Sequence, residues 1–349
     1  MADDGALLLT TNPGLEPLVR AELQAAHPSA RVTLRPHRHL GRVRAEADDP
    51  DALERACLGL RSVHHVLRLR GGFALPPGGD LDDVRAAVAA TALPELEGAR
   101  AFRVRSRRHG DHPFQSPDVE RAAGAVLVQR TGLPVDLKGE DAITVRVDLR
   151  ERAGTIGVQR TTAALSHRFY PRPYQQRTSL KANVAFAALR ALERPPRRLL
   201  DPFCGSGTIL LEAGALFPEA ALFGSDKKPA AADGAARNLA AFGFGERAAT
   251  RQGEVERLGA HWSGERFDAI VTNPPYGVRM GGRLDFRRFY ARLLGQLEPL
   301  LAPEGAVVLL ATREEALGDA AARRGWAMEV VWRVETRSTT PAIARLTPG

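Results

Sequence analysis

The sequence is poor in cysteine and contains no long hydrophobic run. Its 349 residues include two cysteines, Cys57 and Cys204, which excludes a disulfide framework and a cysteine-based zinc site and fits a reducing compartment. No stretch approaches the ~20 consecutive apolar residues of a membrane-spanning helix. The acidic start Met1–Asp4 lacks the basic and apolar regions of a signal peptide. We therefore expect a cytoplasmic protein with no membrane partner.

Side chains at metal-ligand spacing are also missing. The histidines at His64–His65 and at His109 and His112 have no cysteine or carboxylate partners at a suitable spacing. We expect no bound metal.

Positive charge, in contrast, is in surplus. The composition is that of a folded protein, with 44% hydrophobic and 26% charged residues, and the net charge is +8. A basic balance favours a polyanionic partner, although an arginine-rich coding bias explains the surplus equally well. Nine basic residues and one acidic residue lie between Arg160 and Arg198, so the excess is concentrated in the middle of the chain.

The first two parts of the chain predict small α+β domains. Residues 1–50 have expected strands at Ala6–Thr10 and Gly41–Ala45, with an amphipathic helix after the breaker Asn12–Gly14. Residues 51–162 mix short helices with alternating strands. The elements expected there are helices Leu53–Leu60, Leu81–Ala90 and Asp118–Thr131 and strands Ala101–Arg107 and Ala142–Leu149.

Residues 163–180 are expected to form a basic linker. Ser166–Arg177 contains two prolines, two tyrosines and three arginines, a composition that disfavours a helix. One interpretation is a plain spacer. The other is a surface on which Arg168, Arg172 and Arg177 contact phosphates while the tyrosines stack on bases.

Residues 181–349 alternate strand and helix. This order predicts an α/β fold with a doubly wound, mostly parallel sheet that binds ligands at the carboxyl ends of its strands. The expected strands are Arg198–Asp201, Ala221–Asp226, Ala249–Gln252, Phe267–Thr272 and Gly305–Thr312, followed by an antiparallel pair at Met328–Val334 and Ala342–Leu346. The expected helices are Gly207–Phe217, Ala230–Phe242 and one whose apolar face runs from Phe286 to Leu301.

A glycine loop connects the first of these strands to its helix. Gly205 and Gly207 carry no side chain, so a ligand can lie against the backbone. The spacing is not G-x-G-x-x-G, and no Gly-Lys-Ser/Thr follows, which argues against a dinucleotide or nucleoside phosphate. Asp201, just before the loop, suits a zwitterionic ligand with a cationic sulfonium better than a pyrophosphate.

Two further acids follow the next two strands. Asp226 ends the second strand, where doubly wound folds bind a ribose diol; the alternative is a helix N-cap ahead of Pro229. Glu254 follows the third strand, where it is placed to accept a hydrogen bond from an adenine amino group. The alternative is an ordinary exposed glutamate.

The fourth strand ends in Asn273-Pro-Pro-Tyr276. The prolines fix an extended backbone, which allows the Asn273 side-chain oxygen and the Pro274 carbonyl to point outward as two acceptors for the hydrogens of a planar amine. Tyr276 offers a ring face to a base. The pattern predicts a site that binds an amino group on a planar ring.

Together these motifs resemble those of a known enzyme class. Asp-Pro-Phe-Cys-Gly-Ser-Gly-Thr at 201–208, Asp226 and the Asn-Pro-Pro-Tyr corner are similar to class I amino-methyltransferases, which use S-adenosylmethionine. Phe102–Glu120 looks like the central part of a THUMP domain, an RNA-binding module, and Thr11–Glu16 looks like the opening of the ferredoxin-like domain that precedes it. The ordered set resembles THUMP-containing tRNA guanine-N2 methyltransferases of the TrmN type.

The resemblance implies ferredoxin-like, THUMP and Rossmann-like methyltransferase domains at 1–50, 51–162 and 181–349. It also implies three groups of site residues. Those for S-adenosylmethionine are Asp201, Phe203, Cys204, Gly205, Gly207, Thr208, Asp226, Glu254 and Asn273. Those for the target base are Asn273, Pro274 and Tyr276. Those for RNA are Arg105, Arg107, Arg108, His112, Arg168, Arg172 and Arg177. Glu254 departs from the family, which commonly has aspartate there.

The implied reaction is methyl transfer to guanine N2 in tRNA, at position 6 of the acceptor stem, by a monomer. Three alternatives stay open: methylation of a guanine in ribosomal RNA or of adenine N6, methylation of a protein glutamine, and RNA binding with a vestigial catalytic core. The THUMP-like half argues against glutamine, and the intact Asp201, Asp226 and Asn273 argue against a vestigial core. A nucleophilic role for Cys204 does not fit an Asn-Pro-Pro-Tyr corner.

Overall fold

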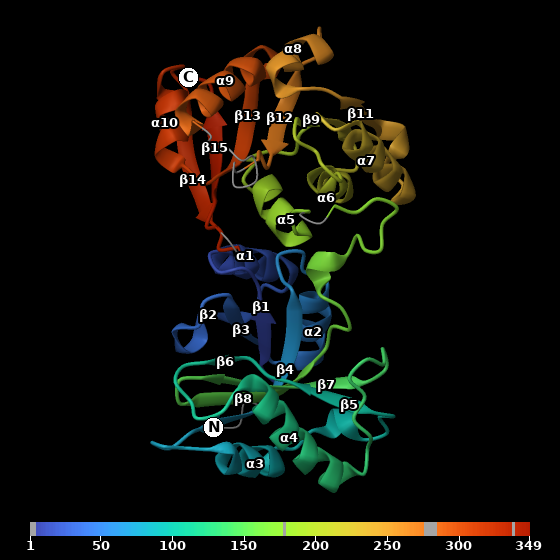
Figure 1. Cartoon of the computed structure of the whole chain (residues 1–349), viewed down its shortest axis with the longest axis vertical. Coiled ribbons are helices and arrows are strands. Elements are labelled where there is room, and N and C mark those ends of the chain that lie inside the picture. Colours follow the sequence, from blue (N-terminus) through green and yellow to red (C-terminus); the bar gives the residue numbers. More distant parts are fainter. Residues whose placement is uncertain (1–4, 177–178, 276–284, 337–338) are drawn as a thin grey trace. The chain divides into compact units, whose positions relative to one another are not determined.

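The computed structural model describes residues 5–176, 179–275, 285–336 and 339–349. The chain divides into two compact units (Figure 1). The first comprises residues up to 11 and 16–165, and the second comprises residues 12–15 and 166–349. Among the described residues, no helix has both the length and the apolar character needed to cross a membrane.

The first unit is built on one continuous sheet in the order β2-β3-β1-β4-β8-β7-β5, with β6 beside β7. Its strands are β1 Leu7–Thr10, β2 Arg31–Leu34, β3 Arg42–Glu46, β4 His65–Ala74, β5 Phe102–Arg105, β6 Arg108–His109, β7 Ile143–Arg150 and β8 Ala153–Gln159. Its helices are α1 Glu16–Ala26, α2 Pro50–Leu58, α3 Leu81–Ala90 and α4 Ser116–Thr131, with 3-10 turns η1 Pro36–Arg38, η2 Pro94–Leu96 and η3 Leu165–His167.

Strand β4 joins the strands β2, β3 and β1 to the strands β8, β7 and β5 of this sheet. It pairs antiparallel with β1 on one side and with β8 on the other. Leu53 and Cys57 of α2 and Val66 of β4 share a hydrophobic core with Leu7 and Leu9. Helix α2 begins at Pro50, where the sequence predicts the end of the first domain, yet α2 shares this core. We therefore propose that the first domain extends through α2 into β4. A second core lies between α3, α4 and strands β7 and β8.

The second unit has a seven-stranded sheet in the order β11-β10-β9-β12-β13-β15-β14. Its strands are β9 Arg198–Asp201, β10 Ala221–Asp226, β11 Ala248–Gln252, β12 Phe267–Thr272, β13 Leu301–Ala311, β14 Ala327–Arg333 and β15 Ala342–Thr347. Its helices are α5 Ala182–Arg190, α6 Thr208–Leu216, α7 Pro229–Ala241, α8 Leu258–His261, α9 Phe286–Leu297 and α10 Glu314–Ala322, with 3-10 turns η4 Gly245–Arg247, η5 Val255–Arg257 and η6 Glu298–Leu300.

The expected doubly wound sheet is confirmed. Strands β9 to β13 pair in parallel, while β15 runs antiparallel to β13 and β14. The register places Gly224 opposite Asp201, Asp226 opposite Gln252 and Ile270 opposite Leu200. Since parallel strands end at the same edge, the segments that follow β9, β10, β11 and β12 meet at one edge of the sheet.

Residues 12–15 are part of this second unit. The Asn12 side chain donates to the Glu335 carbonyl (2.7 Å) and its oxygen accepts from Asn183 (3.0 Å), while the Glu335 N–H donates to the Pro13 carbonyl (2.9 Å). A Cβ on Gly14 would lie 1.7 Å from the Arg333 carbonyl oxygen, so only glycine fits there. Leu15 is fully buried.

Candidate active site

The loop after β9 is shaped by two glycines in the left-handed region. Gly205 has φ +54°, and Gly207, the N-cap of α6, has φ +80°. A Cβ at Gly205 would lie 3.1 Å from the Gln176 side-chain oxygen, and one at Gly207 would lie 3.3 Å from the Ala235 Cβ. The loop therefore requires glycine for its backbone shape and for its close packing against Gln176 and Ala235.

Asp201 ends β9 in a nearly fully buried position, with 2% of its surface exposed. Its Oδ1 accepts from the Thr272 hydroxyl (2.7 Å) and from the Phe203 N–H (3.1 Å). Burial raises the pKa of Asp201 to about 7, and these two hydrogen bonds counteract part of that effect. A buried acid with such a perturbed pKa beside a glycine loop is typical of a ligand site.

Asp226 ends β10 and is half-buried. Its Oδ2 accepts from the Gly205 N–H (3.1 Å) and its Oδ1 from the Lys228 N–H (2.9 Å). The carboxylate thus ties the glycine loop to the turn before α7. It lies at the edge where the sequence analysis expects it, although α7 takes Lys228 rather than Asp226 as its N-cap.

Three other residues of the loop have different surroundings. Cys204 is buried, and burial raises the pKa of its thiol well above the usual value, so it is not a thiolate nucleophile. Phe203 is half-buried, with its ring 6.4 Å from that of Phe289 on α9. The hydroxyl of Thr208 accepts from Arg172 (3.1 Å), so this side chain is engaged within the protein.

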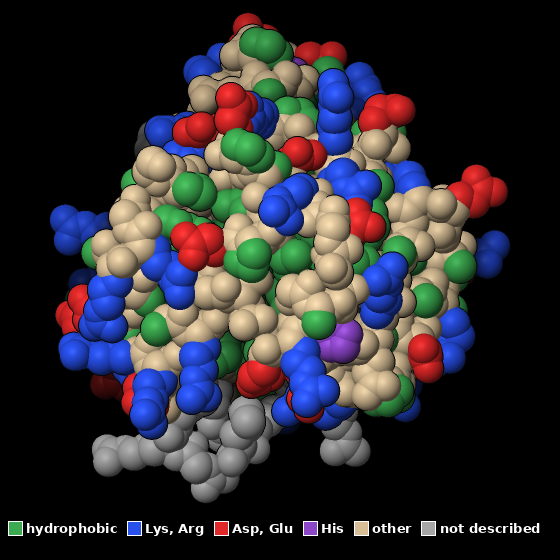
Figure 2. Space-filling view, turned by 90° about the horizontal axis from the view of Figure 1, so that it is seen from above, with side chains coloured by type: hydrophobic (Ala, Val, Ile, Leu, Met, Phe, Trp, Pro, Cys, Tyr) green, Lys and Arg blue, Asp and Glu red, His purple; other side chains and the backbone are tan. Residues whose placement is uncertain are grey.

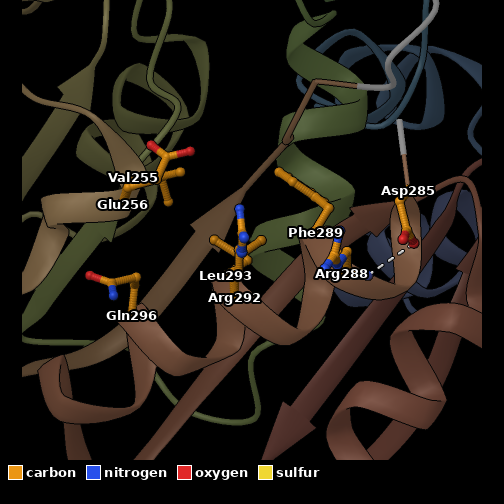
Figure 3. A pocket seen from close by; sticks show the side chains of 8 residues that line it. All are labelled: Val255, Glu256, Asp285, Arg288, Phe289, Arg292, Leu293 and Gln296. Carbon is orange, nitrogen blue, oxygen red and sulfur yellow. Dashed lines mark hydrogen bonds between the residues drawn. The ribbon is translucent and has the colours of Figure 1, made fainter. Parts of the chain in front are cut away.

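Glu254 is exposed and precedes the turn η5. Next to it, a cavity of about 230 Å³ lies between η5 and α9 (Figure 3). Its lining residues are Val255, Glu256, Asp285, Arg288, Phe289, Arg292, Leu293 and Gln296. The Asp285 carboxylate caps α9 by accepting from the Arg288 N–H (3.1 Å). The cavity borders the glycine loop through the contact of Phe289 with Phe203.

The corner after β12 begins with Asn273, which is half-buried, and Pro274, which is buried. It follows Thr272, whose hydroxyl reaches Asp201. The corner is therefore held beside the start of the glycine loop. Tyr276, the other residue expected to hold the target base, lies outside the described residues.

The arginines of the expected linker point inward. Arg168 pairs with the buried Glu212 of α6 (2.6 Å). Arg172 is 6% exposed, donates to Thr208 and to the Tyr170 hydroxyl, and lies over the Tyr170 ring. This placement argues against the expected RNA contacts of Arg168 and Arg172, because both guanidinium groups bind side chains of α6 instead. Arg177 lies outside the described residues.

The sequence analysis missed that this same segment braces the glycine loop. Tyr174 donates its N–H to the Asn238 side chain (2.9 Å), which in turn donates to the Tyr174 and Ser206 carbonyls (2.8 and 2.9 Å). Ser179 lies 2.9 Å from the Ser206 hydroxyl, and Gln176 faces Gly205. The run of polar residues after two prolines was the available signal.

The expected RNA contacts in the first unit lie around β5 and β6. Arg107 is exposed, and Arg105 lies 3.6 Å from Glu120. Arg108 donates to the Gly110 carbonyl and to Gln115 and lies 3.1 Å from the His112 ring. Arg107 therefore projects most freely. Among the described residues, no group of three or more histidine, cysteine or acidic side chains is arranged to hold a metal.

Comparisons with known proteins agree with this anatomy. Residues 79–159 match the THUMP domain model, and residues 170–342 match the model described as an RMKL-like methyltransferase domain. A tRNA (guanine(6)-N2)-methyltransferase of Thermus thermophilus is 39% identical over 87% of this chain and 88% of its own length. A tRNA (guanine(10)-N2)-dimethyltransferase of Methanothermobacter thermautotrophicus is 30% identical over 66% of this chain and 67% of its own length.

Solved structures show the same relationship. The crystal structure of TrmN from Thermus thermophilus superposes with a TM-score of 0.82 at 36% identity, over 99% of both chains. SMU.472, a putative methyltransferase complexed with SAH, has a TM-score of 0.75 at 16% identity, which shows a shared fold. The chain belongs to the family of THUMP-containing, S-adenosylmethionine-dependent tRNA guanine-N2 methyltransferases typified by TrmN.

Proposed function

We propose that the chain transfers a methyl group from S-adenosylmethionine to N2 of guanine 6 in tRNA. The observation that carries the proposal is the common edge of β9, β10 and β12, where Asp201, the glycine loop, Asp226 and the Asn273-Pro274 corner meet. Position 6 rests on the Thermus thermophilus relative, which is named for guanine 6 and matches 87% of this chain. The 30% identical relative named for position 10 matches 66% of it.

The residues at this edge fit S-adenosylmethionine. The left-handed backbone of Gly205 and Gly207 shapes the turn against which the methionine part would lie, and a Cβ at either position would press on Gln176 or Ala235. Asp201 would receive the cationic ammonium of the methionine part, and Asp226 the ribose diol. The cavity beside Glu254, lined by Val255 and Phe289, would take the adenine ring.

The target amine needs alignment, because the lone pair of a guanine amine is delocalised into its ring. S-adenosylmethionine supplies the methyl group on a sulfonium that is already a strong electrophile. The Asn273 side-chain oxygen and the Pro274 carbonyl would accept hydrogen bonds from the two N–H groups of the amine. These bonds would aim the lone pair and stabilise positive charge that develops on nitrogen. Such alignment lowers a barrier by roughly 7–11 kcal/mol, and preorganised acceptors add to it.

A labelling assay tests the substrate class. Purified protein is incubated with methyl-labelled cofactor and, separately, tRNA, ribosomal RNA or a glutamine-bearing release-factor-like protein. Label is expected in tRNA as N2-methylguanosine. Label confined to protein or ribosomal RNA, or formed as N6-methyladenosine, would contradict the proposal.

The position is tested with tRNA transcripts. A transcript in which guanine 6 is replaced by adenine, with its pairing partner changed to match, is expected to lose methylation. A matched change at guanine 10 is expected to leave methylation intact. The opposite result would move the target to position 10.

We also propose that the enzyme is cytoplasmic and acts as a monomer. The free, buried thiols of Cys57 and Cys204 fit a reducing compartment. Light scattering of the tRNA complex is expected to give one protein chain per tRNA, and two chains would contradict this.

A further inference from the structure

Thr272 is the last residue of β12 and directly precedes the Asn273-Pro274 corner. It is fully buried, and its hydroxyl donates to the Asp201 carboxylate on the neighbouring strand β9 at 2.7 Å. One buried hydrogen bond therefore joins the strand that carries the corner to the strand that carries the glycine loop.

Both donors to Asp201 bind the same oxygen. The Thr272 hydroxyl and the Phe203 N–H end on Oδ1, and within the described ranges no hydrogen bond is formed to Oδ2. Two donors on Oδ1 fix the plane of the carboxylate. Oδ2 is then the oxygen that remains for a ligand, and its direction depends on Thr272.

The charge of Asp201 also depends on these donors. Burial raises the pKa of the carboxyl group to about 7, the hydrogen bonds from Thr272 and Phe203 lower it, and the Asp226 carboxylate at the end of β10 raises it. The nearby Cys204 thiol is itself kept neutral, because burial and these two acids raise its pKa. Thr272 is thus one of two groups that favour the charged carboxylate.

We propose that Thr272 is a positioning residue that aims the Asp201 carboxylate at the cationic ammonium of the methyl donor and links cofactor binding to the Asn273 corner. The proposal rests on the proposed function and requires no contact between Thr272 and the cofactor. It assigns to the hydroxyl a role in affinity and pH dependence, separate from packing.

The test uses Thr272→Val, which keeps the shape and removes the hydroxyl, in the full chain. Calorimetric titration with S-adenosylmethionine is run from about pH 6 to about pH 9. At pH 7 the variant is expected to bind about tenfold more weakly, and its affinity midpoint is expected to move up by about one pH unit. At high pH, where both carboxyl groups are ionised, the difference is expected to shrink to about twofold, and this remainder measures the lost direction of the carboxylate. The ligand's own ionisation affects the affinity of variant and wild type equally, so it cancels when the two affinities are divided at each pH.

Three further variants separate positioning from packing. Thr272→Ser is expected to restore the wild-type curve, and Thr272→Cys, a weak donor of similar size that also serves if Thr272→Val does not fold, is expected to give an intermediate shift. Thr250→Val on β11 removes a hydroxyl that donates to the Ala232 carbonyl (2.9 Å) and is expected to lower stability without moving the midpoint.

An unchanged midpoint in Thr272→Val or Thr272→Cys, or a serine variant that fails to restore it, would overturn the positioning role while leaving the proposed function in place. A wild-type protein that binds no S-adenosylmethionine at any pH would overturn the proposed function, and the inference would fall with it.

Discussion

Two buried carboxylates, one in each unit, are held in opposite ways. In the first, Asp148 is shared by Arg42 (3.3 Å) and Arg146 (2.8 Å), all three nearly buried. In the second, burial raises the pKa of Asp201 to about 7, and no cation among the described residues is paired with it. A buried charge whose partner is in the fold stabilises structure, whereas a buried charge held only by hydrogen bonds is ready for a ligand.

This contrast predicts a large stability loss for Asp148→Asn. The change leaves two buried guanidinium groups without their carboxylate; burial already lowers the pKa of Arg42 to about 10. We expect a loss of about 3–5 kcal/mol in unfolding free energy, measured by urea denaturation, with unchanged affinity for S-adenosylmethionine. A loss below about 1 kcal/mol would show that the cluster is not needed for stability.

Asp201→Asn is expected to do the opposite of Asp148→Asn: it should lower the affinity for the cofactor and change how stability depends on pH. Its pKa is about 7 in the folded protein against a usual 3.8, so the folded state binds the extra proton between these values. The contribution of Asp201 to the unfolding free energy therefore falls by roughly 4 kcal/mol as pH rises from about 4 to about 7. The variant should lack this slope and also lose cofactor affinity. A slope equal to that of wild type would contradict the assignment.

Asn273→Ala is expected to abolish methyl transfer for practical purposes, with kcat falling about 100- to 1,000-fold. Cofactor affinity should stay largely intact, because Asp201, Asp226 and the glycine loop are unchanged. Single-turnover rates and equilibrium titration measure the two quantities. If affinity is lost instead, Asn273 holds the cofactor rather than the base.

Arg172→Ala is expected to lower stability by about 2 kcal/mol and to leave the salt dependence of tRNA binding unchanged. The reason is that Arg172 is buried against Thr208 and Tyr170. Thermal denaturation and tRNA titration at several salt concentrations measure both effects. A lower salt slope at unchanged stability would restore the RNA contact that the sequence analysis expects.

Arg107→Ala should give the smallest effect. This exposed arginine of the first unit is expected to contribute a few-fold to tRNA affinity and about one unit to the salt slope. The face of the molecule drawn in Figure 2, which is viewed from above Figure 1, shows Lys and Arg side chains interleaved with acids. A matched change at Arg121, which pairs with Asp118, should leave the slope unchanged.

The strands of the second unit were predictable where they form short apolar runs. Ala221–Asp226 and Phe267–Thr272 have the bounds that the sequence predicts, because a strand buried on both faces shows as a short apolar run. Helix α5 was missed although all but its last residue are buried, because it directly follows the proline-rich segment that was interpreted as a linker. Strands β4 and β8 were missed because arginines and glycines interrupt their alternation.

The site residues also fall into a group whose place could be predicted and a group whose place could not. Asp201, Gly205, Asp226 and Asn273 occupy the expected edge because strand order alone brings them together. The inward direction of Arg168 and Arg172 could not be predicted, because it depends on the side chains of α6 that meet them.

The segment at residues 12–15 has a consequence for synthesis. Asn12 binds the backbone of a residue 323 positions later. At about 5–20 residues per second, a ribosome needs roughly 15–65 seconds to add that length. During that interval Leu15 and its polar neighbours lack their final partners, so the second unit is completed only after Glu335 has been synthesised. Expressing residues 166–349 alone would leave this unit without residues 12–15.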